Sequence, residues 1–155
     1  MRKRTNSKVP DKSLKTLRAH CDRLWSLSVR HDWVDRCAVC GSSTTEAHHM
    51  TPRSYEATRF NVNNGIALCF THHYSDKEMA PHMNAAGWMA WLLREHPGRA
   101  EWYIDNRRPV FAGKKNVEYY LGVIRRLQQY VEPLEFERIV GVRFAAWWAE
   151  TAERE

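Results

Sequence analysis

Two short sequences decide the fold of this chain: CAVCGSSTTEAHH (residues 37–49) and NGIALCFTHH (residues 64–73). Together they hold three of the four cysteines and four of the eight histidines. Cys37-x2-Cys40 and Cys69-x2-His72 supply soft ligands in two closely spaced pairs, which is the pattern of a tetrahedral structural zinc site. We therefore expect a Cys3His zinc knuckle.

More ligands are present than one zinc ion binds. His48, His49, Asn64 and His73 are left over, and these residue types hold a second metal with open positions, activate a water molecule and orient a base. A purely structural zinc module is the alternative, but it gives these four side chains no role. A disulfide framework is disfavoured, because paired thiols this close in sequence usually bind metal. Cys21 falls on an apolar helix face and is expected in the core.

The order His49-x14-Asn64-x8-His73, placed between the halves of a zinc knuckle, resembles the HNH endonuclease family. That family cleaves nucleic-acid phosphodiester bonds with a ββα-metal fold. The resemblance covers residues 33–80, where residues 46–52 are similar to the first strand and its exit, and residues 64–69 to the second strand. One position departs from many relatives, which have a fourth cysteine where this chain has His72.

The fold class expected is α+β, with a ββα-metal HNH core and zinc knuckle over residues 33–80. A disordered basic arm (1–11), an N-terminal helix (12–32) capped by Ser13, and a helical extension (81–155) complete the chain. Within the core, we expect strands at 44–49 and 64–68, a long loop at 51–63, and a helix from Phe70 that runs past Lys77 to Pro81. The extension should hold helices at 85–96, near Trp102 and at 116–131, and a last short helix with exposed Phe144 and Trp148.

The resemblance implies a role for each leftover side chain. His49 is the expected general base, since imidazole titrates near neutral pH, and Asn64 is expected to fix its orientation. His48 and His73 are expected to hold a divalent ion such as Mg²⁺, Mn²⁺ or Ni²⁺. Zinc is expected on Cys37, Cys40, Cys69 and His72, although an exchange of His72 with His73 stays open.

Two features of this assignment depend on geometry. Successive strand residues point to opposite faces, so a bulge or a strand end must bring His48 and His49 to one site. Nucleases of the colicin type, which share the spacing, have a further histidine four residues after the last motif histidine. Here that residue is Lys77, which leaves only His48 and His73 as expected protein ligands. Arg53 and Arg59, in the predicted loop, are candidates for phosphate contacts.

Charge points to a nucleic-acid partner. The net charge is +6, but residues 1–30 carry nine Lys/Arg and two Asp, a net of +7, so the remainder is near neutral. Such an arm suits contact with phosphates. We therefore expect a DNA endonuclease of phage or mobile-element type. The alternatives are a non-catalytic zinc-stabilised nucleic-acid-binding module, a junction-resolving nuclease of the endonuclease VII type, or an RNase.

Assembly and location are expected from the same reasoning. One ββα-metal site cuts one strand, so cutting both strands would require a homodimer. No run of 18 apolar residues occurs and the first residues are polar, so neither a membrane span nor a secretory signal is expected. A cytoplasmic protein follows, in the host cell if it is phage-encoded.

Overall fold

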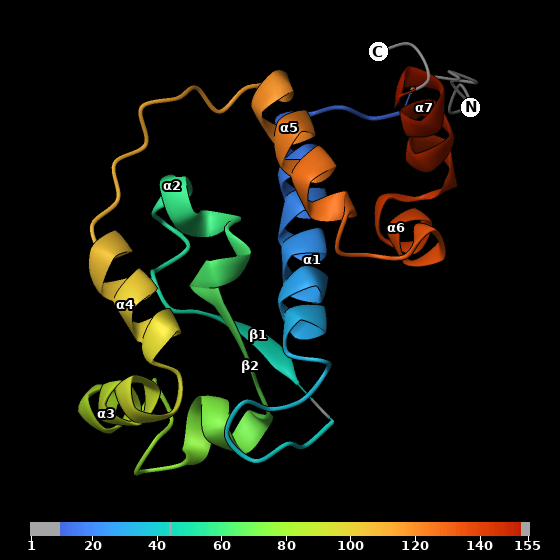
Figure 1. Ribbon diagram of the computed structural model, residues 1–155. Coiled ribbons are helices and arrows are strands. Elements are labelled where there is room, and N and C mark those ends of the chain that lie inside the picture. The colour runs from blue at the N-terminus through green and yellow to red at the C-terminus, as the bar shows by residue number, and fades with distance from the viewer. Residues whose placement is uncertain (1–9, 44, 153–155) are drawn as a thin grey trace, which may run out of the picture. The chain divides into compact units, whose positions relative to one another are not determined.

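The computed structural model describes residues 10–43 and 45–152 (Figure 1). Its helices and strands confirm the predicted α+β class. In chain order they are α1 (Leu14–Asp32), β1 (Glu46–His49), α2 (Glu56–Arg59), the 3-10 helix η1 (Val62–Asn64), β2 (Gly65–Leu68), the π-helix η2 (Thr71–Ser75), α3 (Ala85–Glu95), α4 (Pro97–Asn106), α5 (Val117–Gln128), α6 (Pro133–Val140) and α7 (Val142–Ala152).

The chain forms two compact units. One is Trp25–Gly113, and the other joins Met1–Leu24 to Lys114–Glu155, so helix α1 contributes its two halves to different units. These units group the residues differently from the four ranges expected from the sequence. Residues 1–9, most of the expected basic arm, lie outside the described residues. At the start of α1 the Ser13 hydroxyl accepts a hydrogen bond from the Thr16 amide at 3.3 Å, as a helix cap does.

The two strands form an antiparallel hairpin in which His49 pairs with Gly65 and Glu46 with Leu68. All four residues of β2 are buried. A Cβ atom on Gly65 would lie 2.1 Å from a methyl of Val29 in α1, so only glycine lets the helix approach the strand this closely. The hairpin therefore carries His48 and His49 on a strand fixed from behind by β2 and α1.

The segments after each strand differ from expectation. The predicted loop at 51–63 contains α2 and the start of η1. The predicted helix from Phe70 to Pro81 is wrong in length, because η2 ends at Ser75 and Asp76 is extended. The Asp76 carboxylate accepts hydrogen bonds from the amides of Glu78 and Met79, which stabilises a turn in place of further helix.

The core of Trp25–Gly113 lies beneath the hairpin. Helices α3 and α4 pack against it and agree with the predicted helices at 85–96 and near Trp102. Each fully buried leucine or isoleucine there contributes about 1.5–3 kcal/mol relative to exposure. The buried members of this core are Cys37, Ile66, Leu68, Trp88, Trp91, Leu92 and Ala100.

In the described residues of the second unit, all regular secondary structure is helical. Cys21 is fully buried, as expected, and its thiol donates to the Tyr120 carbonyl. Phe144 and Trp148 were expected to be exposed, but their side chains are buried, at 2% and 5% exposure. They fill the core because α6 and α7 fold back on each other. In the described residues, every helix is too short or too polar to cross a bilayer.

Candidate metal centres

The four knuckle residues come together as the sequence predicts. The donor atoms of Cys37, Cys40, Cys69 and His72 all lie within 4.8 Å of one another. The Cys40 and Cys69 sulfurs are 3.8 Å apart, which is about the edge of a tetrahedron with metal–sulfur bonds of about 2.3 Å. His72 Nδ1 lies 3.2 Å from the Cys69 sulfur. These donors fit tetrahedral zinc.

Local backbone geometry makes this cluster. Gly41 has φ +72°, and its amide donates to the Cys37 carbonyl, which closes the return after Cys40. The Ala38 amide donates to Ala67 of β2, so the knuckle is fastened to the hairpin. Burial opposes ionisation of Cys37, but hydrogen bonds from the amides of Cys69, Cys40 and Val39 outweigh it and lower the pKa of this thiol to about 7.

A second cluster consists of three histidines. The ring nitrogens of His48, His73 and His82 all lie within 4.8 Å of one another, and His48 Nδ1 is 3.0 Å from His73 Nε2. We call this set the histidine triad. His48 comes from β1, His73 from η2 and His82 from the turn before α3. Three imidazoles at this separation can hold a divalent ion and leave positions for other ligands.

His82 is the ligand candidate that the sequence did not reveal. The expected set contained only His48 and His73, because Lys77 occupies the position where a third ligand was sought. His82 follows His73 by nine residues, a spacing that no common ligand motif uses. It reaches the triad because the chain turns at Asp76 and again at Ala80, whose carbonyl accepts from the Met83 and Asn84 amides.

Glu46 stands behind the triad. Its carboxylate accepts a hydrogen bond from His73 Nδ1 at 3.0 Å, which directs His73 Nε2 toward His48. In the zinc knuckle, the Asp76 carboxylate lies 3.8 Å from His72 Nε2, so it contacts His72 less closely than Glu46 contacts His73. Burial, together with the neighbouring His73, His82 and His49, lowers the pKa of His48 to about 3. Burial also lowers the pKa of His73. Both imidazoles are therefore neutral near pH 7, as a metal ligand must be.

His49 points away from the triad, as strand alternation requires. Its ring stacks on Trp25 of α1 with centroids 3.5 Å apart, and its Nε2 lies 2.9 Å from the Arg59 carbonyl. A carbonyl only accepts, so Nε2 carries the proton and the basic lone pair belongs to Nδ1. Because His49 is the last residue of β1, it still borders the same cavity as His48. Both histidines thus border one cavity, but only His48 belongs to the triad, and the role of His49 as general base stays a prediction.

Asn64 fastens the segment between the strands. It is fully buried, its side-chain oxygen accepts from the Thr51 amide at 2.7 Å, and its NH2 donates to the carbonyls of Thr51 and Thr58. The contact with Thr58 positions the chain just before Arg59, whose carbonyl contacts His49. Asn64 therefore acts on His49 through the backbone of α2.

The two candidate phosphate-binding arginines differ. Arg53 is exposed. Arg59 is 6% exposed, and its guanidinium donates to the Arg53 carbonyl at 2.7 Å. The structure thus gives Arg59 a role in holding the segment, and phosphate contact by either residue stays a prediction.

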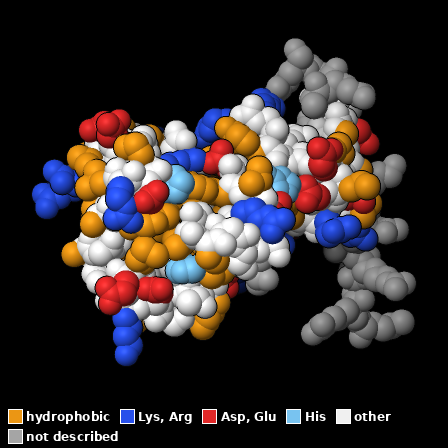
Figure 2. Space-filling view, turned by 60° about the horizontal axis from the view of Figure 1, so that its bottom comes forward, with side chains coloured by type: hydrophobic (Ala, Val, Ile, Leu, Met, Phe, Trp, Pro, Cys, Tyr) orange, Lys and Arg blue, Asp and Glu red, His pale blue; other side chains and the backbone are white. Residues whose placement is uncertain are grey.

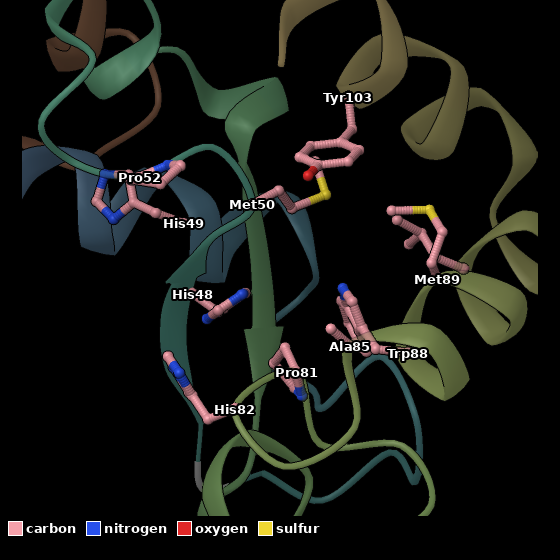
Figure 3. A pocket seen from close by; sticks show the side chains of 11 residues that line it. His48, His49, Met50, Pro52, Pro81, His82, Ala85, Trp88, Met89 and Tyr103 are labelled. Carbon is pink, nitrogen blue, oxygen red and sulfur yellow. The ribbon is translucent and has the colours of Figure 1, made fainter. Parts of the chain in front are cut away.

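A cavity of about 250 Å³ opens beside the triad (Figure 3). His48, His49 and His82 border one side of it, and helices α3 and α4 supply the other through Trp88, Met89 and Tyr103. On the face shown in Figure 2, histidine atoms are visible at the surface among hydrophobic side chains. A molecule bound near the triad would therefore meet imidazoles on one side and apolar groups on the other.

Comparisons of the chain with protein-family models, with curated proteins and with solved structures find no match.

Proposed function

We propose that this chain is a metal-dependent HNH-type endonuclease that hydrolyses DNA phosphodiester bonds. The observation that carries the proposal is the histidine triad beside a histidine held at the strand end, both bordering one cavity. A zinc knuckle on the same hairpin supports the proposal, because it fixes the strand and the π-helix that bear these side chains. A zinc-binding module without catalysis would not require the triad.

The chain's own residues would have different roles in the reaction. His48, His73 and His82 would hold the divalent ion, with Glu46 orienting His73. When bound, that ion supplies Lewis-acid stabilisation of charge on the phosphate and leaving oxygens. Three imidazoles favour Mn²⁺, Ni²⁺ or Zn²⁺ over Mg²⁺, which prefers oxygen ligands.

His49 would act as the general base. Its Nδ1 takes a proton from the attacking water as the water oxygen bonds to phosphorus and the bond from phosphorus to the 3′ oxygen breaks. The leaving oxygen takes a proton from solvent, so the products are a 5′-phosphate and a 3′-hydroxyl. Trp25 and the Arg59 carbonyl restrict the ring to one orientation, and Asn64 holds that carbonyl in place.

The deciding experiment is a plasmid assay with the purified protein and each of Mg²⁺, Mn²⁺, Ni²⁺ and Zn²⁺. We expect nicked circles, and linear product if a dimer cuts both strands. His49→Ala should lower the cleavage rate by a factor of about 100 or more, as loss of a general base does, while zinc content and DNA binding stay close to wild type.

His31→Ala is the matched control, because His31 lies in the same unit outside both clusters, 3.8 Å from Asp35. It should cleave at the wild-type rate. Binding of DNA without cleavage in any of the four ions would reject the endonuclease in favour of a binding module. Branched and RNA substrates in the same assay distinguish the remaining alternatives.

A further inference from the structure

The cavity beside the histidine triad has the chemistry of a binding site for a flat ring. Its volume of about 250 Å³ is below the range of about 300–1,000 Å³ that drug-sized ligands occupy. One or two fused rings fit such a space. Met50, Trp88, Met89 and Leu92 are among the residues that line it, and methionine and tryptophan are favourable partners for an aromatic face.

Besides the imidazoles of His48, His49 and His82, two side chains of α3 and α4 bring polar atoms to the cavity. Figure 3 shows the indole nitrogen of Trp88 and the hydroxyl of Tyr103 facing into the cavity. The indole N–H is a donor, and the hydroxyl both donates and accepts. An apolar pocket with a few convergent polar groups is typical of a site that selects one heteroaromatic ligand.

The position of the cavity indicates which ligand. Trp88 lies edge-on to His48 with centroids 6.0 Å apart, and it is held from behind by stacking on Trp91 at 5.0 Å. A phosphate attracted to a metal-loaded triad would thus sit one sugar away from the aromatic wall. In a nucleic acid, the group attached to that sugar is a base.

We propose that this cavity binds one unpaired nucleobase of the substrate strand, next to the phosphate held at the triad. This inference rests on the proposed function and names its substrate class, a nucleic acid with an unpaired nucleotide at the cleavage site. A paired base is stacked between its neighbours and cannot enter a pocket, whereas a bulged or single-stranded base can. Contact with the edge of Trp88, which is 5% exposed, and with the side chains of Met50 and Met89 would stabilise the unpaired state.

The test compares DNA hairpins that differ at one position. They carry a bulged adenine, an abasic residue at the same bulge, or no bulge, with phosphorothioate linkages around the position to slow hydrolysis. Fluorescence anisotropy of the full chain, loaded with zinc and Ni²⁺, measures binding. We expect the adenine bulge to bind about tenfold more tightly than the abasic one, as one stacked base does. Equal affinity for these two hairpins overturns the inference.

Two variants locate the preference. Ala85→Phe fills the cavity at its rim, and Ala86→Phe places the same ring on the neighbouring exposed residue, which is not part of the wall. The tenfold ratio should disappear in the first and persist in the second; a ratio that survives in both overturns the inference. If Ala85→Phe does not fold by circular dichroism, Met89→Trp, one turn further along α3, fills the cavity instead and takes its place.

The outcome is separate from that of the plasmid assay. A base preference without cleavage in any ion retains the cavity as a nucleobase site and rejects the endonuclease. Cleavage without a base preference retains the endonuclease and rejects the cavity as a nucleobase site.

Discussion

The zinc knuckle and the histidine triad each take one histidine from the same π-helix, but their sets of donor atoms differ. Cys69 and His72 point into the knuckle, while His73 points into the triad. The knuckle offers four donors, three of them thiols, which is a complete tetrahedral set. The triad offers three imidazoles and borders a cavity. A closed set stabilises a fold, whereas an open set leaves positions for water and substrate.

The difference shows how one short segment can serve both purposes. Successive residues of a helix point in different directions around its axis, and His72 and His73 accordingly face different clusters. The zinc ion would therefore anchor the same backbone that presents His73. Loss of the knuckle should destroy the triad, but loss of the triad should leave the knuckle intact. Substitutions in each cluster test this asymmetry.

Cys40→Ser should remove zinc and unfold residues 25–113. Structural zinc contributes about 10–16 kcal/mol of apparent binding free energy, which matches or exceeds the whole stability of a typical domain at about 5–15 kcal/mol. Zinc content and thermal unfolding followed by circular dichroism measure the change. Cys21→Ser is the control, since this buried thiol belongs to the other unit; it should retain zinc. A Cys40→Ser protein that melts like wild type would contradict the structural role of the knuckle.

His82→Ala should weaken the second metal without loss of the fold. Loss of a residue that only supports a metal ligand lowers the metal affinity by up to about 100-fold. Removal of one of the three imidazole ligands should lower Ni²⁺ or Co²⁺ affinity by more than that. His82 is exposed, so its truncation creates no cavity. Isothermal titration on zinc-loaded protein measures the affinity, with His31→Ala as control. Unchanged affinity would show that the triad does not bind metal through His82.

The carboxylates behind the two clusters give a finer comparison. Glu46→Gln should lower the affinity of the triad for Ni²⁺ by about 10–100-fold, because the charge that supports His73 is lost. Asp76→Asn should change zinc retention by less, since the Asp76 carboxylate is 3.8 Å from His72, whereas the Glu46 carboxylate is 3.0 Å from His73. Competition with a chromogenic chelator measures both ions in each variant. Equal losses of metal affinity at the two clusters would contradict the expected difference between the two carboxylates.

The two clusters also differ in how far the sequence predicts them. Cys37, Cys40 and Cys69 follow from spacing, and so does His72 with His73 as the open alternative, because ligands separated by two residues lie on one tight turn whatever surrounds it. His48 and His73 follow from the motif order. His82 depends on a turn that replaces the expected helix after Ser75, and that turn is set by Asp76 capping amides further on. No periodicity in the sequence signals such a change.

The burial of Phe144 and Trp148 escaped prediction for a related physical reason. Short amphipathic helices do not indicate which partner covers them until the tertiary packing is known. The long helices were predictable, because their apolar residues recur at i, i+3, i+4 and i+7 over several turns. The hairpin was predictable because Asn64-Gly65 precedes a short apolar run.

The smallest expected effect concerns a buried histidine outside both clusters. His20 is 6% exposed, packs edge-on against Phe144 at 5.1 Å, and its Nδ1 has no hydrogen-bond partner among the described residues. Burial, with the neighbouring charge of Arg23, lowers the pKa of His20. The unfolded chain therefore binds a proton below pH 6.5 while the folded chain resists it. Stability is unaffected above that pH and falls as the pH drops below it.

Urea unfolding at pH 7.5 and 5.5 should show this loss in the wild-type chain, at less than about 1.4 kcal/mol per pH unit for a single proton. In His20→Gln the loss should be smaller, because the titrating group is gone. Added Ni²⁺ should not restore the stability lost through His20, whereas it should oppose acid destabilisation that arises at the triad, since metal and protons compete for the same imidazole nitrogens. If Ni²⁺ completely prevents the loss of stability at low pH, that loss arises at the triad and His20 makes no contribution to it.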